Sequence, residues 1–370
     1  MKKIIIIKIG SNVITQNGLE FNKNFIKNLG KQIVNLRKSK PNHKIVIVSS
    51  GAIAEGVKKL GWKNKPKNLP KLQAAAAVGQ LELIWRYQNI FTKMKLDVAQ
   101  VLLTHQELSN RTQYLNARKS IMNLIDLNII PIINENDVVA TEEIQFSDND
   151  HLAALVCNLI EAEKFIIITD QKGLFDKNPE KYKSAKLIEE IEYNNPLLNE
   201  IDGSSKSSWG KGGIKTKINA CIIASKGSTK CYIISADEKN FVEKIINDQN
   251  LGTTILPKEK IISSRKQWLQ NLPKSKGEFI VDNGAKTAIT KNQKSLLPVG
   301  VKKVIGNFIK GDLIIIKTSN GKEIARGLVN YSSEKANLIK GLSSKEINSK
   351  FGQIDEESII NKDNLVVLDN

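Results

Sequence analysis

The chain has little of what a disulfide framework or a membrane span requires. Its 370 residues include only three cysteines, Cys157, Cys221 and Cys231, and none of them stands at CxxC spacing. An odd number of scattered cysteines argues for a reducing compartment and against a disulfide or metal framework. No apolar stretch approaches the roughly 20 residues that cross a bilayer, and no small-residue cleavage site follows the first lysines, so we expect no signal peptide. These absences predict a cytoplasmic protein without a membrane partner.

The motifs of several common enzyme classes are also missing. The sequence contains no GxxxxGK[ST], no GxGxxG after its first apolar run, no HExxH and no GxSxG. It therefore gives no support for a P-loop or a dinucleotide-binding site. The three histidines, His43, His105 and His151, lie far apart in the sequence. We predict that they are surface or helix-end residues rather than catalysts.

Acidic residues are outnumbered, with 38 Asp and Glu against 56 Lys and Arg, which leaves a formal net charge of +18. Such an excess can indicate a nucleic-acid partner. The lysines, however, are scattered along a chain rich in Ile, Lys and Asn, aromatic residues make up only 5%, and no compact patch of arginines and aromatics occurs. We interpret the charge as that of solvated surface lysines.

Apolar runs that end in small or polar residues are abundant in the first 260 residues. A helical stretch at 22–39 follows the first run, and strands separated by helical segments predict βαβ units with a mostly parallel sheet that is covered on both faces. The fold class is therefore α/β. The runs are "KIIIIKIG" (3–10), "KIVIVSSGAI" (44–53), "LDVAQVLLT" (96–104), "IIPIINEND" (129–137), "KFIIITD" (164–170) and "CYIIS" (231–235).

The character of the chain changes in its last quarter. Residues 278–330 hold short strand-like runs with turn signals between them, and Asn320-Gly321 is a strong hairpin signal. The stretch before them is rich in Pro, Ser and Lys, which is typical of a linker. We therefore predict a catalytic domain over 1–260, a linker over 261–275 and a small β-rich domain over 276–360.

Lysines, glycines and acidic groups gather at the predicted strand ends, where open α/β sheets bind their ligands. Lys8 ends the first buried run, and a buried lysine needs a negative partner. The stretches "SSGA" (49–52) and "WGKGGIKTK" (209–217) offer backbone N–H groups to an anion. The run Asp148-Asn149-Asp150 exceeds what a helix cap needs and is suited to hold magnesium indirectly, to orient lysines or to bind an ammonium group.

This combination of groups is suited to phosphoryl transfer. The reaction depends mainly on positioning and on neutralising the charge of the moving phosphoryl oxygens, which two lysines and Mg²⁺ can do. A carboxylate acceptor needs no general base, which explains the missing catalytic histidine. The phosphate would then be the negative partner of Lys8.

At these residues the sequence resembles the amino acid kinase superfamily, and within it the bacterial glutamate 5-kinases, essentially from end to end. The tail resembles a PUA domain, through "VDNGAKTAI" (281–289), "SLLPVGV" (295–301), "GNFIKGD" (306–312) and "IARGLVNY" (324–331). The segments that carry the kinase resemblance are "IKIGSN" (7–12), "IVIVSSGAIAEG" (45–56), "QAAAAVGQ" (73–80), "QVLLT" (100–104), "YLNAR" (114–118), "IIPIINENDVVATEEI" (129–144), "DNDHLAALV" (148–156), "TDQKGLF" (169–175) and "GGIKTK" (212–217).

The resemblance implies a three-layer amino acid kinase sandwich followed by a small PUA-like barrel. It also implies ATP-dependent, magnesium-assisted phosphorylation of the γ-carboxylate of L-glutamate to L-glutamyl 5-phosphate, the first step of proline biosynthesis. By the same resemblance, Lys8 and Lys217 are the catalytic lysines and Asp150 organises them. The residues matched to glutamate binding are Ser50, Asp137 and Asn149, where Asp suits the ammonium and Ser and Asn suit carboxylate oxygens.

The nucleotide site is matched by Lys8 together with the end of one strand and a glycine-rich loop. The family usually has Thr, Met and a small residue at 211, 214 and 215, so added charge here can alter nucleotide affinity. Trp209 beside the loop is also unusual, and it either stacks on adenine or simply packs. The other matched residues are Thr169, Asp170, Lys211, Gly212, Gly213, Ile214, Lys215, Thr216 and Lys217.

Two classes of alternative remain open. Within the same fold, the acceptor could be acetylglutamate, aspartate, carbamate or a nucleoside monophosphate, although "INEND" and the PUA-like tail favour glutamate. The alternative from another functional class is an RNA-binding or RNA-modifying protein, because the chain is basic and has a PUA-like domain. Residues 276–360 hold 14 Lys and Arg against 9 Asp and Glu, a net charge of +5, which is close to their share of the whole and so gives RNA little support. The resemblance further implies proline as feedback inhibitor, a homodimer or homotetramer, and hand-off of the product to glutamyl phosphate reductase.

Overall fold

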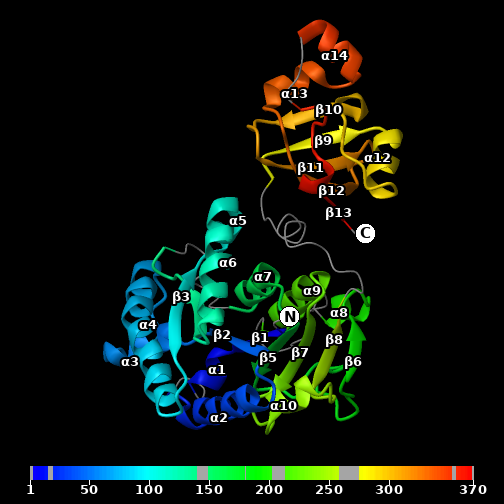
Figure 1. The fold of residues 1–370 in the computed structure, drawn as a ribbon. Coiled ribbons are helices and arrows are strands. Elements are labelled where there is room, and N and C mark those ends of the chain that lie inside the picture. The colour runs from blue at the N-terminus through cyan, green and yellow to red at the C-terminus, as the bar shows by residue number, and fades with distance from the viewer. Residues whose placement is uncertain are drawn as a thin grey trace. The chain divides into compact units, whose positions relative to one another are not determined.

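The computed structural model describes residues 3–15, 20–139, 149–179, 181–201, 213–257, 275–351 and 356–368. The chain divides into two compact units, Met1–Ile261 and Ile262–Asn370 (Figure 1). Most of the predicted linker, over 261–275, lies outside the described residues. The division into a catalytic, a linker and a PUA-like segment stays a prediction of where each function lies.

The first unit is built around β1 (Lys3–Ile9), which pairs in parallel with β2 (His43–Ser49) on one side and β5 (Lys164–Thr169) on the other. Its four consecutive isoleucines are β-branched and nearly inaccessible, as a central strand covered on both faces requires. The sheet has eight strands in the order β3-β4-β2-β1-β5-β7-β8-β6.

The predicted mostly parallel sheet is confirmed. β3 (Val98–Leu103) and β4 (Ile130–Glu135) extend it on one side, and β7 (Lys230–Ser235) follows β5 in parallel on the other. The sequence analysis missed two short strands, β6 (Glu190–Glu192) and β8 (Thr253–Leu256). Since β8 pairs antiparallel with β7, and β6 pairs in parallel with β8, these two strands run against the rest.

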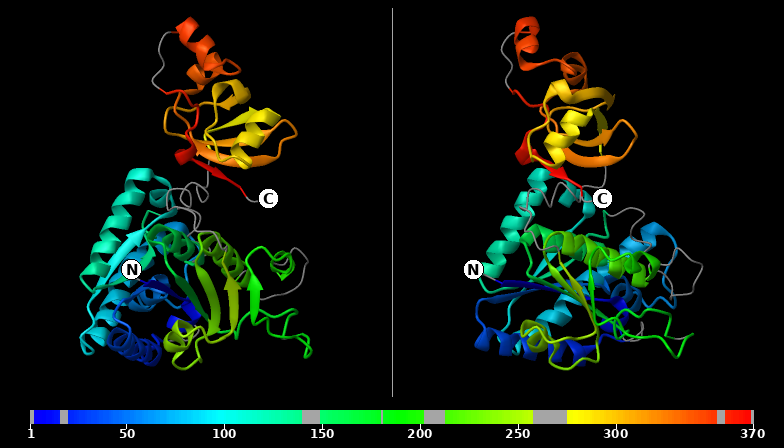
Figure 2. Two further views of the ribbon diagram at one scale, coloured as in Figure 1. Left: turned by 45° about the vertical axis from the view of Figure 1, so that its right-hand side comes forward. Right: turned by 90° about the vertical axis from the view of Figure 1, so that its right-hand side faces the viewer.

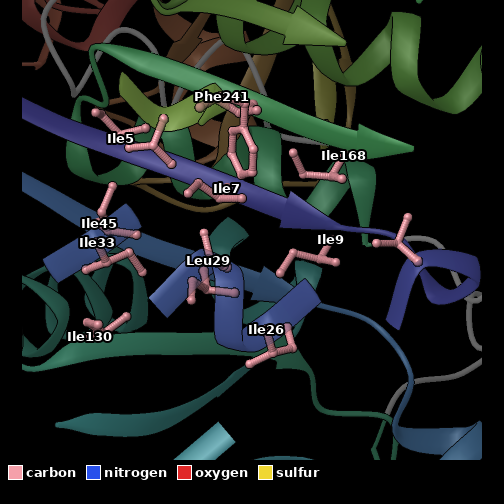
Figure 3. Packing of buried hydrophobic residues seen from close by; sticks show 14 of the residues in the cluster. Ile5, Ile7, Ile9, Ile26, Leu29, Ile33, Ile45, Ile130, Ile168 and Phe241 are labelled. Carbon is pink, nitrogen blue, oxygen red and sulfur yellow. The ribbon is translucent and has the colours of Figure 1, made fainter. Parts of the chain in front are cut away.

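Helices cover both faces of the sheet, which gives the three predicted layers. One face packs against α2 (Lys23–Ser39), α4 (Leu69–Thr92) and α10 (Phe241–Ile246), with Ile5, Ile7 and Ile9 turned toward that core (Figure 3). The other face carries α6 (Arg111–Asp126), α7 (Asp150–Ile160) and α9 (Gly213–Lys226), and both views of Figure 2 show α2 and the green α7 and α9 on opposite sides. Shorter helices are α1 (Ser11–Ile14), α3 (Ala52–Lys59), α5 (His105–Ser109) and α8 (Leu197–Ile201).

Strand alternation decides where Lys8 points. Successive side chains leave a strand on opposite faces, so the odd-numbered isoleucines of β1 turn toward α2 while Lys8 turns toward α7. Residues of α7 contact β1, and Asp150 is the first residue of that helix. The alternation of side chains along β1 therefore places Lys8 on the face of the sheet where the carboxylate of Asp150 lies.

The second unit has a five-stranded sheet in the order β10-β9-β11-β12-β13 and a core of its own that includes Phe279, Ile316 and Ile324. The predicted hairpin is confirmed, because β11 and β12 pair antiparallel around Gly321, whose φ is 83°. A small β-rich domain is thus present. Its elements are β9 (Gly277–Val281), α12 (Asn283–Thr290), the 3-10 turn Pro298–Gly300, β10 (Val301–Gly306), β11 (Leu313–Thr318), β12 (Glu323–Leu328), α13 (Ser333–Ile339), α14 (Ser344–Phe351), the 3-10 turn Lys362–Asn364 and β13 (Leu365–Val367).

Candidate functional site

The carboxyl ends of β1, β2, β4 and β5 lie at one edge of the sheet, next to the first residues of α7 and α9. Parallel strands bring their ends to the same edge, which is where ligands of such sheets bind. Four residues singled out from the sequence, Asp148, Trp209, Lys211 and Gly212, lie outside the described residues. The other predicted site residues are described: Lys8, Ser50, Asp137, Asn149, Asp150, Thr169, Asp170, Gly213, Ile214, Lys215, Thr216 and Lys217.

A buried carboxylate joins the two predicted catalytic lysines. Asp150 is fully buried, and its Oδ1 forms an ion pair with the ammonium group of Lys8. Its Oδ2 lies 3.2 Å from Nζ of Lys217 and accepts a hydrogen bond of 3.0 Å from the hydroxyl of Thr216. Asp150 is therefore a negative partner of Lys8, a role for which the sequence analysis expected a phosphate.

The first turn of α9 fixes the direction of the second lysine. Nζ of Lys217 also donates to the carbonyl oxygen of Gly213, at 2.9 Å, and so folds back over its own helix start. The hydroxyl of Thr216 shares the same carbonyl at 3.2 Å. Ile214 is buried and Lys215 is exposed. An apolar residue at 214 thus packs inward, while the added charge at 215 faces solvent.

A second carboxylate lies where β5 ends. Asp170 accepts hydrogen bonds from the hydroxyl of Thr169, at 3.0 Å, and from Nδ2 of Asn12, at 3.2 Å. Burial raises the pKa of Asp170, but these hydrogen bonds and the charge of Lys217 outweigh it and hold the pKa below its usual value. Asp170 is therefore ionised at neutral pH. The sequence analysis missed Asn12, which lies directly after the quoted Gly-Ser pair.

A cavity of about 420 Å³ opens beside this cluster, and the three predicted glutamate-binding residues, Ser50, Asp137 and Asn149, all line it. Burial raises the pKa of Asp137 to about 6, although the charge of Lys65 acts against the rise. The remaining lining residues are Ser11, Asn12, Thr15, Gly51, Ala52, Ile53, Ala54, Val57, Lys63, Asn64, Lys65 and Asn134.

The turn between β2 and α3 requires glycine. Gly51 has a φ of 107°, and a Cβ atom there would lie 2.7 Å from Cγ2 of Ile14. Only glycine adopts this conformation without strain. The turn holds the hydroxyl of Ser50 at the cavity wall, where the sequence analysis expected small residues.

The sequence analysis missed an amide network that runs from two cavity-lining residues, Asn149 and Asn134, to Gln80. Nδ2 of Asn149 donates to the carbonyl oxygen of Ser49 at 2.9 Å, to Oδ1 of Asn134 at 2.6 Å and to Oγ of Ser50 at 3.3 Å. Nδ2 of Asn134 in turn donates to Oε1 of Gln80 at 2.6 Å. The polar Gln80 at the end of the quoted "QAAAAVGQ" was the available signal, but its partner stands far away in the sequence.

The fold brings together two of the histidines that lie far apart in the sequence. The rings of His105 and His151 have centroids 4.5 Å apart, and Nε2 of His105 lies 3.7 Å from Oε2 of Glu135. Burial lowers the pKa of His105. His43 is the first residue of β2, at the opposite end of the strand from the carboxyl end that borders the site. That the histidines are not catalysts stays a prediction.

Two absences hold for the part of the chain that the structure describes. None of its helices combines the length and the apolar character needed to cross a bilayer. Within the same ranges, no group of three or more His, Cys, Asp or Glu side chains is placed to hold a metal ion.

Comparison with known proteins decides the family. The profile of the amino acid kinase family matches residues 3–235, and that of the PUA domain matches residues 277–351. The chain belongs to the amino acid kinase family. The resemblance of both segments, expected from the quoted motifs, is thereby confirmed.

Relatives of this amino acid kinase cover nearly its whole length. A protein named glutamate 5-kinase from Methylococcus capsulatus is 45% identical over 98% of this chain and 96% of its own length, and one from Nitrosospira multiformis is 44% identical over 98% and 97%. These proteins and the present chain form one family at this level of identity. Among solved structures, carbamate kinase from Giardia lamblia superposes with a TM-score of 0.51 at 15% identity, covering 70% of this chain and 99% of that one. This likeness shows the fold.

Proposed function

We propose that this amino acid kinase transfers the γ-phosphoryl group of ATP to the γ-carboxylate of L-glutamate and so forms L-glutamyl 5-phosphate, the first step of proline biosynthesis. The name shared by its relatives supports this acceptor. The observation that carries the proposal is the buried Asp150, which holds Lys8 and Lys217 beside a cavity lined by groups suited to glutamate.

The two lysines stabilise the phosphoryl group in transit. In the transfer, the bond between the γ-phosphorus and the bridging oxygen of ATP breaks as a bond to the substrate carboxylate forms, and ADP leaves with the electron pair. Lys8 and Lys217 neutralise the charge on the phosphoryl oxygens, which is the main catalytic requirement of this reaction. Asp150 contacts neither substrate in this scheme but orients both ammonium groups, so it is a positioning residue. The glutamate γ-carboxyl, with a usual pKa of about 4.3, is already ionised at neutral pH and needs no base.

The cavity beside the lysines would take the amino acid. Asp137 suits the α-ammonium group, and Ser50 and Asn149 offer further hydrogen-bonding groups at the wall. Asn149 directly precedes Asp150, which contacts both lysines, so a glutamate bound in this cavity can extend its γ-carboxylate toward the phosphoryl group. Positioning of this kind supplies a large part of the barrier reduction in phosphoryl transfer.

The nucleotide would bind between the end of β5 and the start of α9, with Thr169, Asp170 and the segment 213–217, together with Lys211 and Gly212 of the preceding loop. The N-terminus of a helix as long as α9 favours phosphate groups. Mg²⁺ fits this donor set, because it is commonly held by substrate phosphates plus one or two carboxylates rather than by a protein cage. The ionised Asp170 is the side chain that would hold it, and the metal would supply further neutralisation of phosphate charge.

Family membership also supports proposals about regulation and assembly. Proline, like glutamate, carries a positively charged α-nitrogen and an α-carboxylate, so it would compete for the cavity lined by Asp137 and Asn149 as a feedback inhibitor. We further propose a homodimer or homotetramer in the cytoplasm, and transfer of the labile acylphosphate to glutamyl phosphate reductase. Titration with proline and light scattering test the first two. For the PUA domain, RNA binding is a candidate role, and salt-sensitive retention of the protein on RNA would test it.

The proposed reaction is tested by ADP release from the purified protein with Mg-ATP and L-glutamate. Acetylglutamate, aspartate, carbamate and UMP serve as competing acceptors, and hydroxylamine traps any acylphosphate as its hydroxamate. We expect turnover that depends on glutamate and falls about 100-fold or more in Lys8→Ala and in Lys217→Ala, the usual loss for a group that stabilises a transition-state charge. Lys226→Ala, an exposed lysine at the end of α9, is the matched control.

Each outcome has a distinct meaning. Turnover with another acceptor would keep the phosphoryl-transfer chemistry but reassign Asp137 and Asn149. Full activity in both lysine variants would contradict the role of the cluster around Asp150. A folded protein that turns over none of the acceptors would overturn the proposed function and favour the RNA-binding alternative.

A further inference from the structure

We propose that Gln80, on α4, is a positioning residue that makes Asn149 an acceptor for the substrate's ammonium group rather than a donor to its carboxylate. The inference rests on the proposed function and names a contact within it. It assigns a role to a residue behind the cavity that does not line it. It also reverses the chemical role expected of Asn149 from the sequence.

The backbone carbonyl of Ser49 shows which way the amides of the network point, and the oxygen of Gln80 at the other end holds Asn134 in that direction. The oxygen and nitrogen of an amide side chain are distinguished by their partners. The atom of Asn149 that lies 2.9 Å from the carbonyl oxygen of Ser49 must be the amide nitrogen, since a carbonyl only accepts. The atom of Asn134 at 2.6 Å from that nitrogen must then be its oxygen, and its own nitrogen must point at Oε1 of Gln80. The donors therefore run in one direction, from Asn149 to Gln80.

This direction consumes the hydrogen-bonding capacity of the Asn149 amide nitrogen. An amide nitrogen carries two hydrogens, and the oxygens of Ser49 and Asn134 take them, with the hydroxyl of Ser50 sharing at 3.3 Å. No hydrogen bond within the described residues uses Oδ1 of Asn149, and the residue lines the cavity. A substrate group that meets this side chain must therefore donate. The α-ammonium of glutamate donates, whereas its carboxylates only accept.

Asp137 lines the same cavity and supplies a second acceptor. An amide oxygen and a carboxylate that line one cavity match an ammonium group that has three hydrogens to donate. A diacid that lacks the ammonium group would leave both oxygens without a donor. The wall thereby discriminates between an amino acid and the corresponding diacid, as sites with unpaired polar groups do.

The burial and hydrogen bonds of Gln80 indicate that it positions Asn134 rather than adding to the stability of the fold. The residue is 8% exposed, and its Nε2 is buried with no hydrogen-bond partner in the described structure. A buried donor without a partner is costly to keep, and an apolar side chain of the same shape would avoid that cost. The oxygen end of Gln80 is the part that the network uses, because it accepts from Asn134.

The test compares Gln80→Met, which removes the acceptor at similar volume, with Gln80→Glu, which keeps an acceptor oxygen. Gln88→Met, at an exposed position of α4, is the matched control. For each variant we would measure kcat, the KM for L-glutamate, the KM for ATP, and the inhibition constant of glutarate, the diacid that lacks the ammonium group. Thermal unfolding of each variant reports whether it folds.

Without the acceptor of Gln80, Asn134 can turn and Asn149 with it, so the hydrogen bond from the substrate's ammonium group to Asn149 is lost. We expect Gln80→Met to raise the KM for glutamate about 10-fold, the usual effect of losing one hydrogen bond to a charged group. The KM for ATP, kcat and the inhibition constant of glutarate should change little, and Gln80→Glu should restore the KM for glutamate to within about twofold of the original. An equal weakening of glutamate and glutarate would overturn the inference, as would an unchanged KM in Gln80→Met. If Gln80→Met does not fold, a KM in Gln80→Glu raised as much as 10-fold overturns it alone, and one within twofold supports it.

Failure of this inference differs from failure of the proposed function. An original protein that does not release ADP in the presence of glutamate contradicts the proposed function. An original protein that does, with variants that lose glutamate and glutarate alike, contradicts only the role of Gln80.

Discussion

Lys8 shows how far a single residue can be interpreted from the sequence. Its place at the end of an isoleucine run predicts burial, and burial of an ammonium group requires a negative partner. That much follows from neighbouring residues. That the partner is Asp150, on a helix that begins after three further strands, depends on the topology of the sheet, which no local pattern contains. For the same reason the pairing of Asn134 with Gln80 could not be predicted from the spacing of residues.

The protonation of Asp137 should set the acidic limit of glutamate binding. Its pKa is raised to about 6 by burial. A carboxylate attracts the substrate ammonium only when ionised, so binding is intact above this pKa and weakens as the pH falls through it. We expect the KM for glutamate to rise about 10-fold per pH unit below pH 6, while the KM for ATP stays flat. Steady-state kinetics between pH 5 and pH 8 would measure it.

A neighbouring lysine provides the control for that pH dependence. The charge of Lys65 lowers the pKa of Asp137. Lys65→Met should therefore move the acidic limb to higher pH, whereas Lys67→Met, at an exposed position of the same loop, should leave it in place. If the acidic rise in the KM for glutamate did not shift in Lys65→Met, or if this KM were independent of pH across the range, the rise could not be assigned to Asp137.

At the scale of elements, α3 and α4 are packed so closely that glycines form the contact. A Cβ atom on Gly79 would lie 1.8 Å from the carbonyl oxygen of Ala52, and one on Gly56 would lie 1.7 Å from that of Ala75. Ala52 begins α3 directly after the turn at Gly51, which lines the cavity. The helix contact therefore supports the cavity wall from behind.

Adding a methyl group at this contact should affect both stability and binding. Gly79→Ala must push α3 away from α4, and overpacking of this kind costs about 1–3 kcal/mol of the free energy of unfolding. We also expect the KM for glutamate to rise, since the wall around Ser50 moves with α3. Urea unfolding and steady-state kinetics measure the two effects.

The matched control is Ala77→Ser, at an exposed position of the same helix, which should change the free energy of unfolding by no more than about 0.5 kcal/mol. If Gly79→Ala were as stable as Ala77→Ser, the close contact between the two helices would not exist in solution.

Strand length decided which elements could be predicted. The six apolar runs found in the sequence correspond to strands of six or seven residues, β1, β2, β3, β4, β5 and β7. The two that were missed, β6 and β8, have three and four residues. So short a segment shows no period, and each of these strands owes its pairing to the edge that its longer neighbour provides.

On the scale of the whole molecule, the two units have separate hydrophobic cores. Every described residue of the proposed site belongs to the first unit, including the cavity and both lysines. The second unit can therefore have a function of its own. Its β-rich fold was predictable from turn signals such as Asn320-Gly321, but the molecule that it binds was not.

Calorimetry of the full-length protein should resolve two unfolding transitions. Mg-ATP and glutamate should raise the midpoint of one transition only, by mass action on the unit that binds them. Mutation of the second core, for example Phe279→Ala, should lower the other midpoint through the loss of a buried aromatic side chain, which costs about 3–5 kcal/mol. A single transition that shifts with both perturbations would show that the units unfold together.

The central position of β1 in the sheet has a consequence for folding during synthesis on the ribosome. Ile5 of β1 pairs with Lys164 of β5, so β1 cannot complete its pairing until more than 150 further residues have been synthesised. At a synthesis rate of about 5–20 residues per second, this leaves the strand waiting on the order of ten seconds. A run of four exposed isoleucines is the kind of segment that aggregates during such a delay. Because β2 pairs with β1 and follows it closely in the sequence, early pairing of these two strands would shorten the time for which the isoleucines are exposed.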